Sequence, residues 1–257
     1  MLTLRLPVRT LPKRPPLAAT LLLASIVTGS AGASAQDLTP AQRDSVVGIL
    51  RDALKHDPTI LREALAALQA DDAHQQAQAS QDAIARLGPK LTDPADPVAG
   101  NPLGDVTVVE FYDTRCPYCR TMEPVIAELL RRDGRIKLVV KDMPILGPNS
   151  LIESRALLAA QNQGGYFKLR PAILALSGTT TRDTLRDLAD RQGLDGAHLL
   201  HDMDDPAIKA RLDATLGLAP QLGIDGTPAF VIGNRMVSGA ADLREMQAAV
   251  TAARAAR

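Results

Sequence analysis

The stretch of sequence that decides the fold is residues 105–124, DVTVVEFYDTRCPYCRTMEP. Residues 106–112 are apolar nearly throughout, which is typical of a buried central strand. Two cysteines three positions apart follow, and the proline between them suits the first turn of a helix. The pattern predicts a strand, a short turn and then a helix over residues 117–132.

The sequence after this stretch continues the alternation of strands and helices. Residues 136–140 are a second predicted strand, and residues 229–232 are expected to pair with residues 236–238 as a hairpin across a Gly-Asn-Arg turn. A closing helix is expected over residues 241–253. Helical patterns between the two groups of strands lie at residues 150–163, 166–176, 181–192 and 207–222. The predicted order is β-α-β, a helical block, then β-β-α.

The region before residue 88 is predicted to be helical. Thr39, Pro40 and Gln42 form a capping-box pattern with proline at the first helical position, and Asp57-Pro58 repeats the start signal. The second helix is expected to end at Leu87, because Gly88-Pro89 is a strong stop signal.

The later part of this second helix carries a stripe with coiled-coil-like spacing, made of Ala73, Ala77, Ser80, Ile84 and Leu87. One interpretation is a stalk that pairs with copies of itself, because an amphipathic helix must bury its apolar face. The alternative is a helical hairpin folded back on its own domain. Residues 88–104 contain four Pro and three Gly, so a linker is expected over residues 89–104.

The first 35 residues have the layout of a secretory signal peptide. Four basic side chains and no acidic one precede an apolar run over residues 17–27, and Ala33-Ser34-Ala35 matches an A-x-A cleavage site. The alternative is a membrane anchor, but a bilayer span needs about 20 apolar residues. The whole chain has 29 basic and 29 acidic residues, so cleavage would leave 25 and 29, a net charge of −4. We expect a soluble protein exported to the periplasm.

The composition excludes several classes of protein. The balanced charge lacks the basic excess of a nucleic-acid-binding protein. Two cysteines in 257 residues exclude a disulfide-dense scaffold and a four-cysteine zinc site.

The two cysteines are the predicted chemical centre. Cys116 would lie at a helix N-terminus, where unpaired N–H groups and the helix dipole favour a thiolate. Cys119 lies one turn later on the same face, so the two sulfurs can bond. We expect Cys116 to be the exposed nucleophile and Cys119 the more buried resolving thiol.

Three other interpretations of this pair stay open. A structural disulfide across one helical turn would close a tiny loop and remove little chain entropy. A metal site would have only two thiol ligands, since His198 and His201 belong to a distant helical block. Inert buried thiols are the third interpretation. We favour redox chemistry, and we expect no metal site and no cofactor.

Three segments together resemble the DsbA-like branch of the thioredoxin superfamily: residues 109–113 (VEFYD), 116–119 (CPYC) and 226–233 (GTPAFVIG). The resemblance covers about residues 100–255. It implies an α/β protein with a thioredoxin fold and an inserted helical domain, preceded by an N-terminal helical segment for oligomerisation. The implied parts are a signal peptide (1–35), a helical stalk (36–88), a linker (89–104), a thioredoxin-like domain (105–148 and 223–257) and an inserted helical domain (149–222).

The resemblance also implies roles for individual residues. Thr227-Pro228 matches the family's cis-proline loop, where the backbone of Thr227 can pair with a substrate chain as an added strand. Glu110 matches a buried acid beneath the active-site helix, which could accept the proton of Cys119 as a general base. Lys141, ending the next strand, is expected to be its partner; the alternative for both is an ordinary strand-end ion pair.

The dipeptide between the cysteines bears on the direction of the reaction. Pro117 and Tyr118, with Thr227, would shape the substrate surface. A Pro-Tyr dipeptide and the N-terminal extension are most similar to the suppressor-of-copper-sensitivity C family, which includes trimeric isomerases and also monomers without isomerase activity. The resemblance implies a disulfide isomerase or reductase that acts on cysteine-containing proteins, is kept reduced by a membrane electron donor, and assembles, with a trimer favoured, through residues 37–87. The alternatives are a monomeric dithiol oxidase and a periplasmic Cu(I)-binding protein that uses the two thiols as soft ligands.

Overall fold

The computed structural model describes residues 38–256, and the predicted signal peptide lies outside them. The chain divides into two compact units, one ending at Leu61 and the other beginning at Arg62, and each is described by itself.

The first unit contains helix α1 (Pro40–His56). Its capping box is formed as predicted, because the Thr39 side chain accepts from the Gln42 N–H and the Gln42 side chain accepts from the Thr39 N–H. No residue of α1 is buried.

The second unit is built on a five-stranded sheet in the order β1-β3-β2-β4-β5. The strands are β1 (Val98–Gly100), β2 (Val106–Tyr112), β3 (Ile136–Asp142), β4 (Ala229–Ile232) and β5 (Arg235–Ser238). Strands β2 and β3 are parallel, whereas β1 and β4 run antiparallel to their central neighbours and β5 runs antiparallel to β4. The run of residues 106–112 is the central strand, as predicted.

One face of the sheet is covered by α3 (Pro117–Arg132) and α9 (Leu243–Ala255). Met122, Ile126 and Leu129 of α3 share a buried cluster with Met246 and Val250 of α9. The strands supply Val108, Phe230 and Ile232 to the same cluster. This packing fixes the axis of α3, and with it the position of the two cysteines at the start of that helix.

The other face is covered by the end of α2 (Thr59–Leu91) together with α8 (Pro206–Leu218) and a short 3₁₀ turn (Ala219–Leu222). Ala83, Ile84, Leu87 and Leu91 of α2 are buried there. The predicted end of this helix at Leu87 is wrong, because the helix continues through Gly88-Pro89 to Leu91. The burial of Leu91 against the sheet offsets the poor helix propensity of these two residues.

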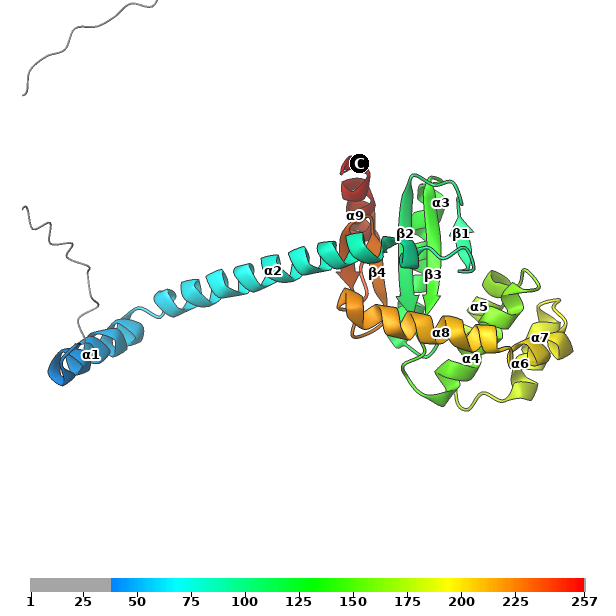
Figure 1. The fold of residues 1–257 in the computed structure, drawn as a ribbon, viewed down its shortest axis with the longest axis horizontal. Helices are drawn as coiled ribbons and strands as arrows, with labels where there is room; N and C mark the ends of the chain where they lie inside the picture. The colour runs from blue at the N-terminus through cyan, green and yellow to red at the C-terminus, as the bar shows by residue number, and fades with distance from the viewer. Residues whose placement is uncertain (1–37, 257) are drawn as a thin grey trace, which may run out of the picture. The chain divides into compact units, whose positions relative to one another are not determined.

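Two further elements were not predicted. Residues 98–100, inside the expected linker, form β1 and pair with β3, with Val98 opposite Val139. The inserted helical block contains α4 (Pro148–Gln161), α5 (Tyr166–Leu174), α6 (Arg182–Arg191) and also a short helix α7 (Gly196–Asp202). Helices α4 to α7 gather beyond one end of the sheet, the end at which β2 runs into α3 (Figure 1).

No helix within residues 38–256 is both long enough and apolar enough to cross a membrane.

Candidate active site

The two cysteines lie at the junction between β2 and α3. Cys116 is the N-cap of α3, with an extended backbone, and Pro117 occupies the first turn. The Cys116 N–H donates to the Asp113 carbonyl at 3.1 Å, which closes the turn between strand and helix. Both thiols are buried, since Cys116 is 3% exposed and Cys119 is 0% exposed. The expectation that Cys116 is exposed is therefore wrong in this state, although Cys119 is the more buried of the two.

The loop before β4 covers Cys116. Its Sγ donates to the main-chain oxygen of Thr227 at 3.1 Å, which accounts for the burial of the thiol. The Thr227–Pro228 peptide bond is cis, as the resemblance to the DsbA-like family implied. Residues 111 positions apart in the chain thus meet at the sulfur.

The two thiols have different surroundings. Burial raises the pKa of the Cys119 thiol far above its usual value, and a hydrogen bond with the backbone of Asp113 only partly opposes this effect. Cys119 is therefore protonated at neutral pH, as a resolving thiol should be before it is needed.

The buried acid Glu110 has a partner that the sequence did not predict. Its carboxylate oxygens accept from Arg170 Nη2 at 3.0 and 2.9 Å, and both side chains are almost fully buried. The same guanidinium lies 3.1 Å from Glu123 on α3 and sits over the ring of Tyr112, 4.2 Å from its centre. Arg170 thus joins β2, α3 and α5 beneath the cysteine-bearing helix.

Lys141 is not the partner of Glu110, so that expectation is wrong. Lys141 pairs with Asp96 at 2.6 Å and donates to the carbonyl of Lys90 at 2.9 Å. In the β2–β3 register Glu110 lies opposite Val140, one position away from Lys141. Because side chains alternate between the two faces of a sheet, Glu110 and Lys141 point to opposite faces.

Comparison with protein families agrees with this geometry. Residues 107–251 match the DSBA-like thioredoxin domain, and residues 42–78 match the copper resistance protein ScsC N-terminal domain. The chain belongs to the DSBA-like thioredoxin family. The predicted thioredoxin fold with inserted helices and an N-terminal helical segment is confirmed.

Individual relatives differ in how much of this chain they match. A thioredoxin-like oxidoreductase from Silicibacter pomeroyi is 41% identical with a TM-score of 0.61, covering 64% of this chain and 95% of its own. Proteus mirabilis ScsC in a transitional conformation is 28% identical with a TM-score of 0.63, covering 86% of this chain and 100% of its own. The similarity to ScsC therefore extends into the N-terminal helices.

Curated relatives include longer proteins. The Na(+)/H(+) antiporter NhaA 1 of Salinispora arenicola is 31% identical over 169 residues, which is 63% of this chain and 26% of the antiporter. The chain spans about a quarter of the length of the first such relatives.

In the DSBA-like domain of this chain, Asp113 organises the turn that precedes Cys116. Its Oδ1 accepts from the Arg115 N–H and the Ser150 hydroxyl, both at 2.7 Å. Its Oδ2 accepts from the N–H groups of Ile145 at 2.8 Å and Leu146 at 2.9 Å. This 0% exposed carboxylate therefore has four donors and needs no cation.

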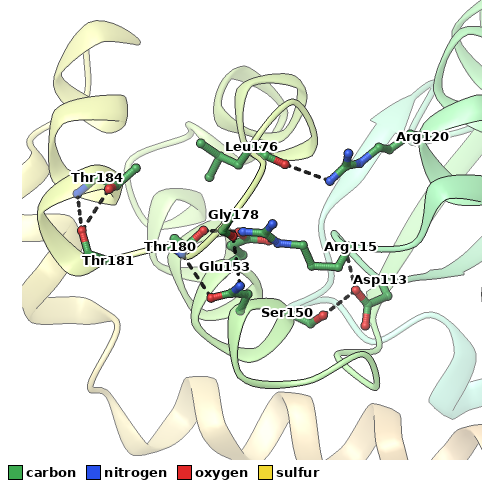
Figure 2. A network of polar contacts seen from close by, with 11 residues as sticks. Asp113, Arg115, Arg120, Ser150, Glu153, Leu176, Gly178, Thr180, Thr181 and Thr184 are labelled. Carbon is green, nitrogen blue, oxygen red and sulfur yellow. Dashed lines mark hydrogen bonds and ion pairs between the residues drawn. The ribbon is translucent and has the colours of Figure 1, made fainter.

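Two arginines connect the same turn and the start of α3 to the inserted helices (Figure 2). Arg115 donates through Nε to Glu153 of α4 at 3.0 Å and through Nη2 to the hydroxyl of Thr180 at 2.5 Å. Arg120 donates through Nη2 to the carbonyl of Leu176 at 3.0 Å.

The outer surface of the motif is formed by the residues predicted to meet substrate. Pro117 is exposed, Tyr118 is 63% exposed and Thr227 is half-buried, whereas Pro228 is buried at the start of β4. Within residues 38–256 no three His, Cys, Asp or Glu side chains are grouped so that they could hold a metal ion.

Sequence reasoning missed Arg170, Glu123, Asp113, Arg115 and Glu153. The alternation of side chains along β2 and β3 could have separated Glu110 from Lys141. A charged side chain in a predicted helix carries no signal that it will be buried, so Arg170 and Glu153 became visible only with the packing of α4 and α5.

Proposed function

We propose that this protein is an exported thiol–disulfide oxidoreductase that acts as a disulfide isomerase or reductase on cysteine-containing proteins. The observation that carries the proposal is the asymmetric thiol pair at the start of α3, with the carbonyl of Thr227 against the sulfur of Cys116. A purely structural Cys116–Cys119 disulfide would not require one of the thiols to lie against a loop that can bind a peptide.

The proposed reaction is thiol–disulfide exchange in two steps. The Cys116 thiolate attacks a substrate disulfide, forms a mixed disulfide and releases one substrate thiolate. In the reductive direction Cys119 then loses its proton and attacks the sulfur of Cys116, which releases the second substrate thiolate and leaves a Cys116–Cys119 disulfide. In isomerisation a second thiolate of the substrate instead attacks the substrate sulfur of the mixed disulfide, which forms a new substrate disulfide and releases Cys116 as a thiolate, so the enzyme leaves reduced.

Glu110 is proposed to assist the loss of the Cys119 proton. Support comes from its burial on the sheet face that α3 covers and from its link through Arg170 to Glu123, four residues after Cys119 on the same helix. Burial raises the pKa of the Glu123 carboxyl, and the nearby Glu110 adds to this while Arg170 opposes it. Because its pKa is raised, the Glu123 carboxyl can carry a proton between the buried pair of Glu110 and Arg170 and the surrounding water.

Substrate is proposed to bind over Pro117, Tyr118, Thr227 and Pro228. Cys116 must part from the Thr227 carbonyl for attack, which frees that oxygen to accept from the main chain of a bound peptide.

The choice of isomerase or reductase over oxidase follows from the resemblance to the ScsC group, whose N-terminal domain matches residues 42–78. We propose assembly through residues 37–87, with three chains favoured, reduction by a membrane electron donor and a periplasmic location.

The proposal is tested with a scrambled-ribonuclease assay of residues 36–257. The reduced wild-type chain should restore ribonuclease activity, Cys116→Ser should abolish this, and Cys119→Ser should accumulate mixed disulfide. Failure of the wild-type chain to exchange any disulfide, together with tight Cu(I) binding that needs both thiols, would replace the proposal with copper binding. Net oxidation of reduced ribonuclease by a monomer would favour a dithiol oxidase instead.

A further inference from the structure

The loop of residues 175–181, between α5 and α6, is fastened to the redox motif on both sides. Arg115 directly precedes Cys116 and reaches Thr180, whereas Arg120 directly follows Cys119 and reaches the carbonyl of Leu176. Figure 2 shows both arginines extending from the motif side toward the inserted helices. We call residues 175–181 the clamped loop.

A third side chain, from α4, fixes the middle of the clamped loop. Asn149 donates to the carbonyl of Gly178 and accepts from the N–H of Thr180, both at 3.1 Å. Gly178 has a positive φ of 70°, a conformation that side-chain-bearing residues rarely adopt. The loop is therefore held in one shape before any substrate arrives.

The loop is polar and open between its tethers. Ser177, Gly178 and Thr179 are exposed, whereas Thr180 is buried beneath them at 6% exposure. Rigid, exposed hydroxyl and main-chain groups suit the hydrogen-bonding needs of an extended peptide, and preorganisation lowers the entropic cost of binding.

Arg115, which holds one end of the clamped loop, has its charge compensated by Glu153. Glu153 is fully buried, and Arg115 occupies both of its oxygens while Thr180 donates to Oε1 at 2.5 Å. The Arg115 guanidinium is thus neutralised within the protein. It therefore holds the clamped loop through the geometry of its hydrogen bonds rather than through its net charge.

We propose that the clamped loop is a binding wall for the substrate polypeptide beside Cys116, and that Arg115 and Arg120 are positioning residues that hold it there. The expected ligand is an extended peptide segment flanking the reactive cysteine of the substrate. This inference rests on the proposed thiol–disulfide exchange and adds the surface that distinguishes peptides from small disulfides.

The test compares two disulfide substrates by stopped-flow kinetics, bis(2-hydroxyethyl) disulfide and a disulfide-linked dimer of a ten-residue peptide. Arg120→Met should lower the rate constant with the peptide by about 3- to 15-fold, the equivalent of one or two hydrogen bonds, and leave the small disulfide within about twofold. Arg182→Met is the matched control, because Arg182 also donates to a main-chain carbonyl, that of Leu200, but from α6.

A double variant, Arg115→Met with Glu153→Gln, removes the other tether without leaving a buried carboxylate unpaired. This double variant should show the same selective loss, a lower rate constant with the peptide disulfide and a rate constant with the small disulfide within about twofold of the wild type. An equal slowing of both disulfides would mean that the arginines act on Cys116 itself and would overturn the inference, as would no change with either.

Charge variants test contact directly and leave the fold intact, because Thr179 is exposed. Thr179→Glu should favour a peptide with Lys beside its cysteine over one with Glu by about 3- to 10-fold, and Thr179→Lys should reverse the preference. An unchanged preference would overturn the inference. A wild-type chain that reacts with neither disulfide would instead overturn the proposed function, which separates the two failures.

Discussion

Glu110 and Lys141 lie on adjacent parallel strands, yet each has its own partner on its own face of the sheet. Glu110 is paired with Arg170 beneath α3, and Lys141 with Asp96 on the other face. At the scale of single residues, the acid near the redox site is therefore tied to the inserted helices rather than to the neighbouring strand.

The first prediction concerns Arg170. Arg170→Met should lower the free energy of unfolding by about 3–5 kcal/mol, because Glu110 would be left as an unpaired buried charge. Arg170→Met with Glu110→Gln should recover most of the loss. Urea unfolding measures both, and Lys209→Met, which breaks the exposed pair with Asp213, should change stability by less than about 1 kcal/mol. A loss below about 1 kcal/mol for Arg170→Met would contradict the assignment.

The second prediction concerns Asp142 at the end of β3. Its Oδ2 accepts from the Tyr166 hydroxyl at 2.9 Å, whereas Oδ1 is buried without a partner among the described residues. Burial raises the pKa of this carboxyl to about 7, and the bond from Tyr166 only partly opposes the rise. The folded state therefore holds a proton that the unfolded chain releases near pH ~4.

Asp142 should accordingly make the protein less stable as pH rises from about 4 to about 7. Asp142→Asn removes this contribution. The free energy of unfolding of the variant should therefore exceed that of the wild type by about 1–4 kcal/mol at pH 8 and by much less at pH 5. Urea unfolding at the two pH values measures the difference. An equal effect of the substitution at both values would show that the carboxyl does not titrate in this range.

At the scale of elements, α2 serves two purposes along its length. Its last turns are core, since Ala83, Ile84, Leu87 and Leu91 pack on the sheet, whereas its first turns keep Leu65 and Leu68 exposed. The expected boundary at residue 88 would therefore cut through the hydrophobic core of the second unit.

The third prediction is that the chain folds without residues 36–70 but not without residues 36–88. Deletion of residues 36–70 should leave the stability of the remaining chain within about 1 kcal/mol, because none of the described residues 38–70 is buried. Deletion of residues 36–88 should prevent cooperative folding, since the loss of buried Ile84 and Leu87 alone costs about 2–5 kcal/mol each. Circular dichroism melts distinguish the two, and a stable 36–88 deletion would contradict the assignment.

At the scale of the whole molecule, α1 and the start of α2 expose many large apolar side chains. They are Val46, Val47, Ile49, Leu50, Leu54, Ile60, Leu61, Leu65 and Leu68. Such exposure marks an interaction surface, which supports the proposed self-association.

The fourth prediction is that residues 36–257 assemble, with three chains favoured, and that deletion of residues 36–70 gives a monomer. Light scattering after gel filtration measures the mass. The monomer should still exchange small disulfides, because the redox site lies wholly in the second unit, but should lose isomerase activity. A monomeric wild-type chain would remove the main support for the isomerase proposal.

The sequence by itself determined most of the elements, though not β1 or α7, and the reactive pair. Local signals suffice for these, because a capping box, an apolar strand and a C-x-x-C before a helix depend on neighbouring residues. The Thr227-Pro228 loop was found through family resemblance. Only the tertiary structure decided which partner Glu110 takes, that α2 ends inside the core, and that two arginines clamp the loop of residues 175–181. Those contacts join residues dozens of positions apart, and the burial that makes a charged side chain demand a partner exists only once the helices have packed.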